Sequence, residues 1–88
     1  MYQNSHDIYN SLGISYDEKK QYDLALQNYQ KCIEIKPDYH MAYYNIAIIY
    51  ANRKDIDLAI KWYTKAIEVN PRYHKAYNNL GNIYKDRN

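Results

Sequence analysis

Residues 9–16 read YNSLGISY, and the same outline returns as YYNIAIIY at 43–50 and as YNNLGNIY at 77–84. Successive copies are 34 residues apart. A shift of 34 residues also superposes His6, His40 and His74, and Pro37 with Pro71. A fixed period of this length is typical of repeat architectures, in which each unit buries its apolar face only by stacking on its neighbours.

Tyrosine makes up much of the repeat. The chain has 13 tyrosines and no phenylalanine. Ten of the tyrosines fall on four repeat positions: Tyr9, Tyr43 and Tyr77; Tyr16, Tyr50 and Tyr84; Tyr29 and Tyr63; Tyr39 and Tyr73. Tyrosine combines a large apolar body with a hydroxyl that needs a partner or a wet edge. We therefore interpret the tyrosine excess as repeat packing and not as a site.

Each repeat has the periodicity of two helices. Apolar and small residues stand three, four and seven apart, on one helix face, at Tyr9, Leu12, Gly13 and Tyr16. A second stripe with helical spacing runs through residues 25–33. Small residues at five positions indicate close helix crossings, with axes roughly 8–10 Å apart; they are Gly13, Ala25, Ala47, Ala59 and Gly81.

Helix ends follow from capping residues and prolines. Asp23 is the expected N-cap of the second helix, Asp57 repeats it, and Pro37 and Pro71 close the helices before them. The predicted helices lie near 6–19, 23–36, 40–53, 57–70 and 74–87. Connections of about three residues force neighbouring helices to be antiparallel. We therefore expect an all-α helix-hairpin solenoid of five helices without strands.

Size, cysteine count and charge exclude several classes of protein. Eighty-eight residues suffice for one small domain, and the single cysteine, Cys32, rules out an intrachain disulfide. The start of the chain has no signal-peptide pattern, and the longest apolar run, residues 46–51, is too short to span a membrane. The expected location is intracellular, cytoplasmic or nuclear. A net charge of +2 indicates neither a nucleic-acid nor a membrane partner.

The charge is distributed unevenly. Residues 6–39 hold six acids and four lysines, residues 40–73 hold three acids and five bases, and residues 74–88 hold one acid and three bases. The first unit is thus acidic and the later ones are basic, so the molecule is expected to be electrically polar along its length.

No group of residues suggests chemistry. The three histidines recur one repeat apart, a helix-packing distance or more, whereas zinc ligands sit about 2 Å from the metal. Cys32 occupies the position of Ala66 in the next repeat, as a small buried hydrophobe would. The sequence predicts no enzyme activity, no cofactor and no metal site.

The pattern Y-x-x-L-G-x-x-Y at 9–16, followed by Ala25, Tyr29, Cys32 and Pro37, resembles the tetratricopeptide repeat. The resemblance covers all but a lead-in of residues 1–5. It divides the chain into two full repeats, 6–39 and 40–73, and the first helix of a third, 74–88. The third looks most like the tetratricopeptide superhelix of O-linked N-acetylglucosamine transferases. Two departures are Lys20 and Lys54, which stand where the family usually has a turn glycine.

The resemblance implies a concave wall made by the first helix of each repeat. Exposed positions of that wall, and asparagines that would pair with a peptide backbone, are the expected binding residues: Asn10, Ile14, Met41, Tyr44, Asn45, Ile48, Asn52, Lys75, Asn78, Asn79 and Asn82. Two alternatives stay open. Ile14 and Ile48 would complete packing between repeats, and Asn45 and Asn79 would tie loops together, as asparagines of the family do, instead of binding a ligand.

The favoured function is a protein-interaction module that holds an extended or helical peptide segment of a partner. One alternative is a structural fragment that self-associates through its terminal helices. Because helix 74–87 lacks a partner helix, one side of it, with Tyr77, Leu80 and Tyr84, should be partly bare. The other alternative, an RNA-binding helical repeat, is disfavoured because such repeats have another period and the charge here is small.

Overall fold

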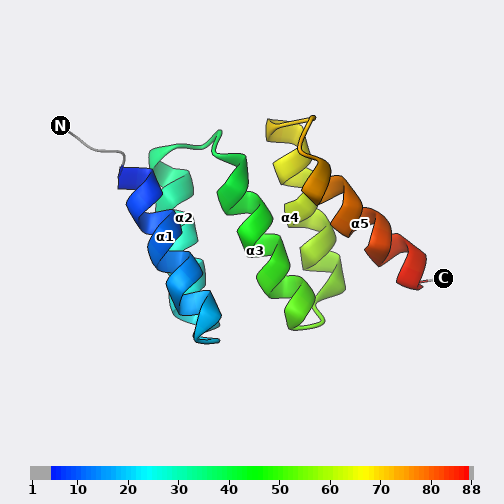
Figure 1. Ribbon diagram of the computed structural model, residues 1–88, viewed down its shortest axis with the longest axis horizontal. Coiled ribbons are helices and arrows are strands. Elements are labelled where there is room, and N and C mark those ends of the chain that lie inside the picture. The colour runs from blue at the N-terminus through cyan, green and yellow to red at the C-terminus, as the bar shows by residue number, and fades with distance from the viewer. Residues whose placement is uncertain (1–4, 88) are drawn as a thin grey trace.

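The computed structural model describes residues 5–87. Five helices follow one another in it: α1 (Ser5–Glu18), α2 (Tyr22–Ile35), α3 (His40–Asn52), α4 (Ile56–Val69) and α5 (His74–Arg87) (Figure 1). The predicted all-α solenoid is confirmed, and no strand occurs between residues 5 and 87. Helices α1, α2 and α4 begin one residue earlier than predicted, while α3 and α5 begin where predicted.

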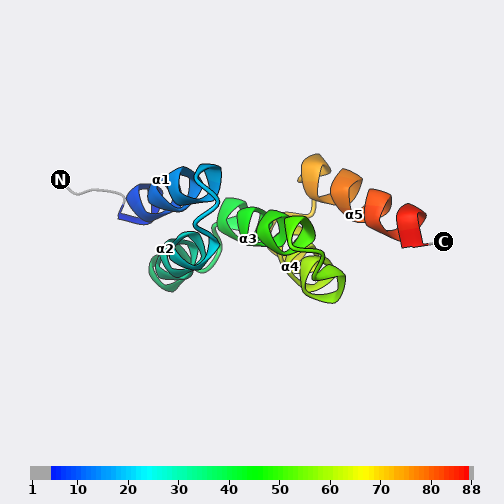
Figure 2. The ribbon, with the colours of Figure 1, turned by 90° about the horizontal axis from the view of Figure 1, so that it is seen from below.

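The helices form two layers. In Figure 2, α1, α3 and α5 make one curved face, with α1 and α5 rising on either side of α3, while α2 and α4 form the other layer, below them in this view. The stack is elongated, measuring 48 × 28 × 15 Å along its principal axes. The curvature arises because α1 packs on α2 and α3 on α4 as hairpins, and each hairpin then rests on the next.

The core consists of two clusters that share a seam. The first, between α2 and α3, contains Ala25, Tyr29, Ile46 and Ile49, all fully buried. The second joins α3, α4 and α5 through Ala47, Ala59, Tyr63, Ala66 and Ala76. Tyr50 and Trp62 pack against both clusters, so the core runs continuously from one hairpin to the other.

Small residues at the crossings have a direct steric cause. A Cβ atom placed on Gly13 would lie 2.5 Å from Cε1 of Tyr29, so only glycine lets α1 approach α2 this closely. Ala47 and Ala59 are fully buried at the corresponding crossing of α3 and α4. The crossing positions read from the repeat are thus the places where these helices meet.

The two hairpin turns have the same backbone structure. Lys20 and Lys54 have φ of 62° and 68°, the left-handed conformation that favours glycine. The Gln21 amide donates to the Tyr16 carbonyl at 2.9 Å, and the Asp55 amide donates to the Tyr50 carbonyl at the same distance. The turn geometry expected at the two lysines is therefore present.

The predicted N-caps are wrong. The N-cap of α2 is Gln21 and that of α4 is Asp55, and neither makes a side-chain capping bond. Asp23 and Asp57 lie in the first helical turn instead. Because the left-handed lysine closes each turn earlier, the helix starts before the aspartate, whose charge then meets the positive end of the helix dipole.

The two ends of the stack leave apolar faces open. Leu12 of α1 is 42% exposed, although its repeat equivalent Ile46 is fully buried. On α5, Tyr77 and Tyr84 are 45% and 50% exposed, as expected for a helix without a partner on that side. Gly81 has nothing within 4 Å of a built Cβ, in contrast to Gly13.

Candidate functional site

The curved face made by α1, α3 and α5 carries the predicted binding residues at three levels of exposure. Those on the surface are Ile14, Asn52, Lys75, Asn78 and Asn82, and those half-buried are Met41, Tyr44, Asn45, Ile48 and Asn79. Asn10 is buried, with 5% of its surface exposed. The middle of the face, on α3, is apolar and aromatic, whereas its two edges are polar.

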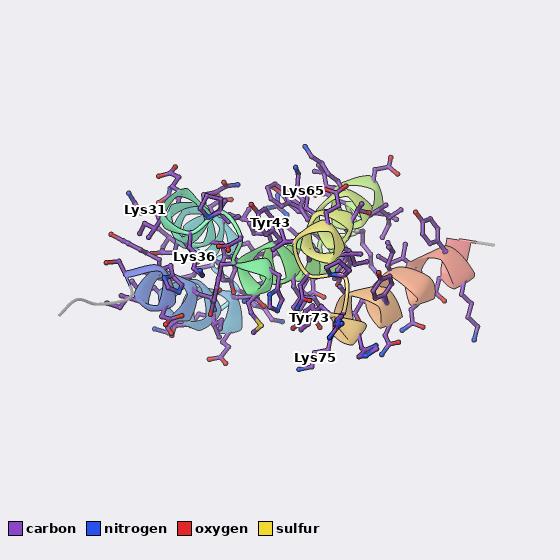
Figure 3. All side chains as sticks on the ribbon, turned by 90° about the horizontal axis from the view of Figure 1, so that it is seen from above. Lys31, Lys36, Tyr43, Lys65, Tyr73 and Lys75 are labelled. Carbon is purple, nitrogen blue, oxygen red and sulfur yellow. The ribbon has the colours of Figure 1, made fainter. Side chains whose placement is uncertain are left out.

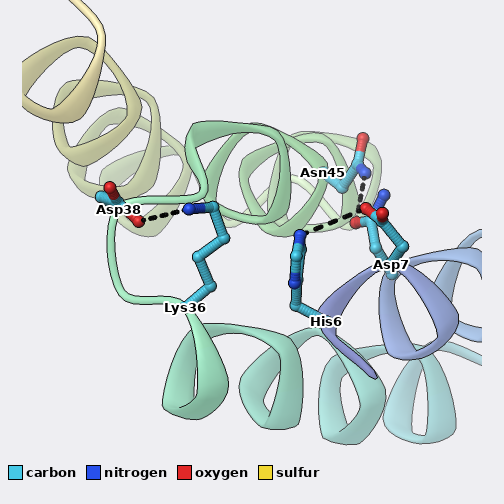
Figure 4. Close-up of polar contacts among 6 residues, drawn as sticks. His6, Asp7, Lys36, Asp38 and Asn45 are labelled. Carbon is cyan, nitrogen blue, oxygen red and sulfur yellow. Dashed lines mark hydrogen bonds and ion pairs between the residues drawn. The ribbon is translucent and has the colours of Figure 1, made fainter. Parts of the chain in front are cut away.

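Asn10 was predicted to lie on the exposed wall, and this prediction is wrong because the residue is buried. The side-chain amide of Asn45 donates a hydrogen bond from Nδ2 to Oδ1 of Asn10 at 3.1 Å (Figure 4). The bond runs from α3 to α1, so it joins the first helices of successive repeats. Burial and this bond withdraw Asn10 from any ligand, because α3 covers it.

In the next repeat, the corresponding hydrogen bond between first helices, from α5 to α3, ends on a tyrosine hydroxyl instead of an amide oxygen. Asn79 of α5 donates from Nδ2 to the Tyr44 hydroxyl at 3.2 Å and to the Tyr63 hydroxyl at 3.1 Å. Asn79 is the repeat equivalent of Asn45, and Tyr44 is the equivalent of Asn10. Both asparagines therefore donate hydrogen bonds between helices, and not to loops as the alternative had it.

Tyr44 takes part in this contact between helices and also belongs to the curved face. Its ring meets Tyr73 edge-on with centroids 5.1 Å apart, and it is tilted against Tyr63 at 5.8 Å. Its hydroxyl accepts the bond from Asn79. Loss of the ring would loosen the packing of α5 on α3, so Tyr44 is both a wall residue and a structural one.

The upper rim of the face is formed by a repeated pair of rings that the sequence reading did not assign. His6 meets Tyr39 edge-on at 4.8 Å, and His40 meets Tyr73 in the same way at 4.5 Å. The Tyr73 hydroxyl lies 3.6 Å from Sδ of Met41. Both pairs sit on fixed repeat positions, which is the signal that would have found them.

Charge differs between the two ends of the face. Burial and the neighbouring charge of Glu18 raise the pKa of the Asp17 carboxyl at the α1 end. His6 Nε2 lies 3.4 Å from Oδ1 of Asp7 at the same end (Figure 4). Lys75 stands at the start of α5, on the side of the molecule opposite to Lys31 and Lys65 (Figure 3).

Cys32 and the histidines are not gathered into a metal-binding group in the part of the chain that the structure describes. Cys32 is fully buried, and burial with the charge of Asp7 raises the pKa of its thiol to about 11, so it stays protonated at neutral pH. Among residues 5–87, no group of three or more His, Cys, Asp or Glu side chains is placed to hold a metal ion. Within the same range, no helix is long and apolar enough to cross a membrane.

The outer layer carries a separate aromatic and basic cluster. Trp62 of α4 stacks on Tyr43 with centroids 5.9 Å apart. The ammonium groups of Lys61 and Lys65 each lie 5.8 Å from the centre of the Trp62 ring. Because Trp62 also packs against both core clusters, we interpret this cluster as part of the core, with the two lysine side chains covering the ring.

A curved stack of antiparallel helix hairpins, with its small residues at the crossings and its first helices forming one wall, defines a helical-repeat solenoid. The chain belongs to the tetratricopeptide repeat family: that family's model matches residues 6–39 and 40–73, and a second model of the same name matches residues 62–88. Such repeats serve as protein-interaction or scaffold modules, so this chain is one.

One solved structure with the same fold is the crystal structure of MamA. It superposes with a TM-score of 0.88 and 27% sequence identity over 96% of this chain, which spans 49% of the MamA chain. None of the curated proteins matches the sequence.

Proposed function

We propose that the curved face of α1, α3 and α5 binds a peptide segment of a partner protein. The observation that carries the proposal is the apolar middle of this face. Ile48 and Met41 are half-buried on α3, and Ile14 is 37% exposed on α1. Ile48 also packs against the core cluster of α3, α4 and α5 with part of its side chain. Apolar side chains on a solvent-facing concave surface are typical of binding sites.

The edges of the face would set the direction of the peptide. Asp7, Asp17 and Glu18 favour basic residues at the α1 end, and Lys75 and Lys85 favour acidic residues at the α5 end. Such charges act more on the rate of association and on register than on affinity. A peptide with a basic end, an apolar centre and an acidic end is the best match.

The backbone of the peptide would be bound by the asparagines that do not take part in the hydrogen bonds between helices. Asn52, Asn78 and Asn82 are exposed, and an amide offers both a donor and acceptors to an extended backbone. Asn45 and Asn79 contribute indirectly, because their bonds to Asn10 and Tyr44 hold the three first helices at fixed spacing. A wall fixed before binding lowers the entropic cost of association.

The test uses a displayed library of random peptides of about 12 residues, which extend to roughly 40 Å. Selected peptides are measured against Ile14→Ser and Ile48→Ser. The matched controls are Leu24→Ser and Leu58→Ser on α2 and α4, which are 39% and 40% exposed and remove the same kind of apolar surface.

Binding should weaken at least about tenfold in the two face variants and stay unchanged in the two controls, because hot spots lie at the centre of an interface. Circular dichroism verifies that each variant is folded. Equal binding by Ile14→Ser and Leu24→Ser would show that the peptide docks elsewhere.

A further inference from the structure

The outer surface of α4 carries two residues that the first repeat lacks. Lys61 takes the place that Gln27 has in the first repeat. Trp62 takes the place of Asn28, whose amide donates a hydrogen bond to the Leu24 carbonyl of its own helix at 2.9 Å. The first hairpin thus forms with two uncharged amides at these positions. The helix-hairpin architecture therefore does not require Lys61 and Trp62.

These residues face α2 and the solvent, and not an end of the stack. The inner side of the Trp62 ring belongs to the core, because it packs against the cluster of α2 and α3 as well as that of α3, α4 and α5. The ring stacks on Tyr43 of α3 with an angle of 24° between their planes. Lys65 lies on the side of the molecule opposite to Lys75 of the curved face (Figure 3). The outer surface of α4 is therefore separate from the curved face.

Two ammonium groups are held at this ring. Nζ of Lys61 and Nζ of Lys65 each lie 5.8 Å from the centre of the Trp62 ring. The two lysines are four residues apart on one helix, a spacing at which like charges are destabilising. Between Asp57 and Glu68 they are the only charged residues of α4. The middle of α4 is thus a local concentration of positive charge, although the helix as a whole is neutral.

Carboxylates suit this arrangement. An acidic side chain at each ammonium group would offset the repulsion between the two lysines, and each ammonium offers three hydrogen-bond donors. Hydrogen bonds between an ammonium and a carboxylate are roughly twice as strong as those between neutral groups. The surface therefore matches a ligand with at least two neighbouring acidic residues.

The Trp62 ring favours an acidic protein over a nucleic acid. Proteins that bind single strands stack the bases on free aromatic faces. The Trp62 ring is already stacked on Tyr43 and packed against the core, so it has no face to offer to a base. The net charge of the chain is only +2, which does not suit the tracking of a phosphate backbone.

We propose that the outer surface of α4 binds an acidic segment of a partner protein, with carboxylates at Lys61 and Lys65. The contact does not rest on the peptide proposed for the curved face, because the two surfaces lie on opposite sides of the molecule. Exposed ion pairs contribute little each, so the association is weak and depends on salt.

The test uses an oligoglutamate of about six residues, roughly 20 Å long when extended, and an oligoglutamine of the same length as the uncharged probe. The double variant Lys61→Gln, Lys65→Gln removes both ammonium groups. The matched control, Lys75→Gln with Lys85→Gln, removes the same charge from α5. A second control, Lys61→Arg with Lys65→Arg, keeps both charges. Circular dichroism verifies that each variant is folded.

Fluorescence anisotropy of the labelled probes measures their affinity. The unchanged chain should bind oligoglutamate more tightly than oligoglutamine, and Lys61→Gln with Lys65→Gln should weaken binding about five- to tenfold. Both controls should bind as the unchanged chain does. Trp62 is the only tryptophan, so its emission should change when oligoglutamate binds. Raising salt from about 0.05 M to about 0.5 M should weaken binding several-fold, because the screening length shortens to less than ~5 Å.

Each contrary result overturns the proposal. Equal affinity for the two probes would mean that the surface does not recognise carboxylates. Equal weakening by the substitutions on α4 and on α5 would mean that the attraction is spread over the whole molecule, and weakening by those on α5 alone would place the probe on the curved face. Loss of binding in Lys61→Arg, Lys65→Arg would mean that packing at Trp62 is decisive, and not charge. Tighter binding of a thymidine oligonucleotide of the same length would assign the surface to nucleic acid.

Discussion

Tyr29 and Tyr63 occupy the same repeat position but satisfy their hydroxyl groups differently. The Tyr63 hydroxyl accepts a bond from Asn79 at 3.1 Å. The Tyr29 hydroxyl is buried and has no hydrogen-bond partner among the described residues. The difference arises because Asn45, which stands where Asn79 stands in the next repeat, turns to Asn10 instead. A buried hydroxyl without a partner costs about 1–3 kcal/mol.

Tyr29→Phe is therefore expected to leave the free energy of unfolding unchanged or to raise it by about 1 kcal/mol, because it removes a group that has lost its water. Tyr63→Phe should lower it by about 1 kcal/mol, because it leaves the Asn79 amide with one bond fewer. Urea unfolding of the two variants measures the difference. Equal destabilisation by both changes would contradict the assignment of these bonds.

His40 makes stability depend on pH. Burial lowers the pKa of its imidazole, and its Nε2 faces the Asn70 amide nitrogen at 3.4 Å, a contact that suits an unprotonated Nε2. The unfolded chain binds the proton more readily, at an ordinary pKa near 6.5. The native state is thus favoured above about pH 6.5 and loses this contribution as pH falls through the folded-state pKa.

The free energy of unfolding is accordingly expected to decrease between about pH 7 and pH 5.5. His40→Gln removes the titrating group while keeping a polar side chain, so it should flatten that slope. Urea titrations at several pH values test this expectation. A steeper slope in His40→Gln than in the unchanged chain would show that other groups control the dependence.

At the scale of the helix, a comparison of the two glycines separates the effect of helix propensity on stability from the effect of side-chain packing. Gly13 and Gly81 are equivalent and both lie inside a helix, where glycine costs about 1 kcal/mol relative to alanine. Only Gly13 has a neighbour, the Tyr29 ring 2.5 Å from a built Cβ. The same substitution should therefore have opposite effects in α1 and α5.

Gly81→Ala is expected to raise the free energy of unfolding by up to about 1 kcal/mol. Gly13→Ala should lower it by about 1–3 kcal/mol, because Tyr29 is fully buried and cannot move aside without disturbing the core. Thermal melts monitored by circular dichroism compare the two. Stabilisation by Gly13→Ala would mean that α1 and α2 lie farther apart than the structure has them.

For the whole molecule, the seam between the hairpins determines cooperativity. Trp62 and Tyr50 pack against both core clusters, so one hairpin cannot unfold without exposing apolar surface of the other. Repeat proteins behave as units coupled by nearest-neighbour interfaces, and a large shared interface makes them unfold together. The single tryptophan lies at this interface and reports directly on it.

Trp62 fluorescence and helical circular dichroism should therefore give the same urea midpoint in the unchanged chain. In Trp62→Ala, the loss of the shared ring should lower stability by about 3–5 kcal/mol or divide the circular dichroism transition into two steps. A fluorescence midpoint well below the circular dichroism midpoint in the unchanged chain would show that the hairpins are uncoupled.

The sequence by itself determined the helices, their order and the crossings. A period of 34 residues repeats every local preference, so the stripe through Tyr9 and Tyr16, the small residues and Pro37 and Pro71 all favour the same hairpin. It also indicated which side of α5 would be bare. The helix starts were misplaced by one residue at Asp23 and Asp57, because turn geometry at a left-handed lysine overrode the capping preference.

The tertiary structure alone decided how the polar residues are used. Helical spacing put Asn10 on the exposed wall, but α3 lies over it and its amide accepts the bond from Asn45. Tyr44 and Asn79 are likewise joined by a hydrogen bond, between α3 and α5. Which asparagines tie helices together and which face solvent depends on the distance between neighbouring repeats. That distance is set by packing between residues far apart in the chain, and no local pattern encodes it.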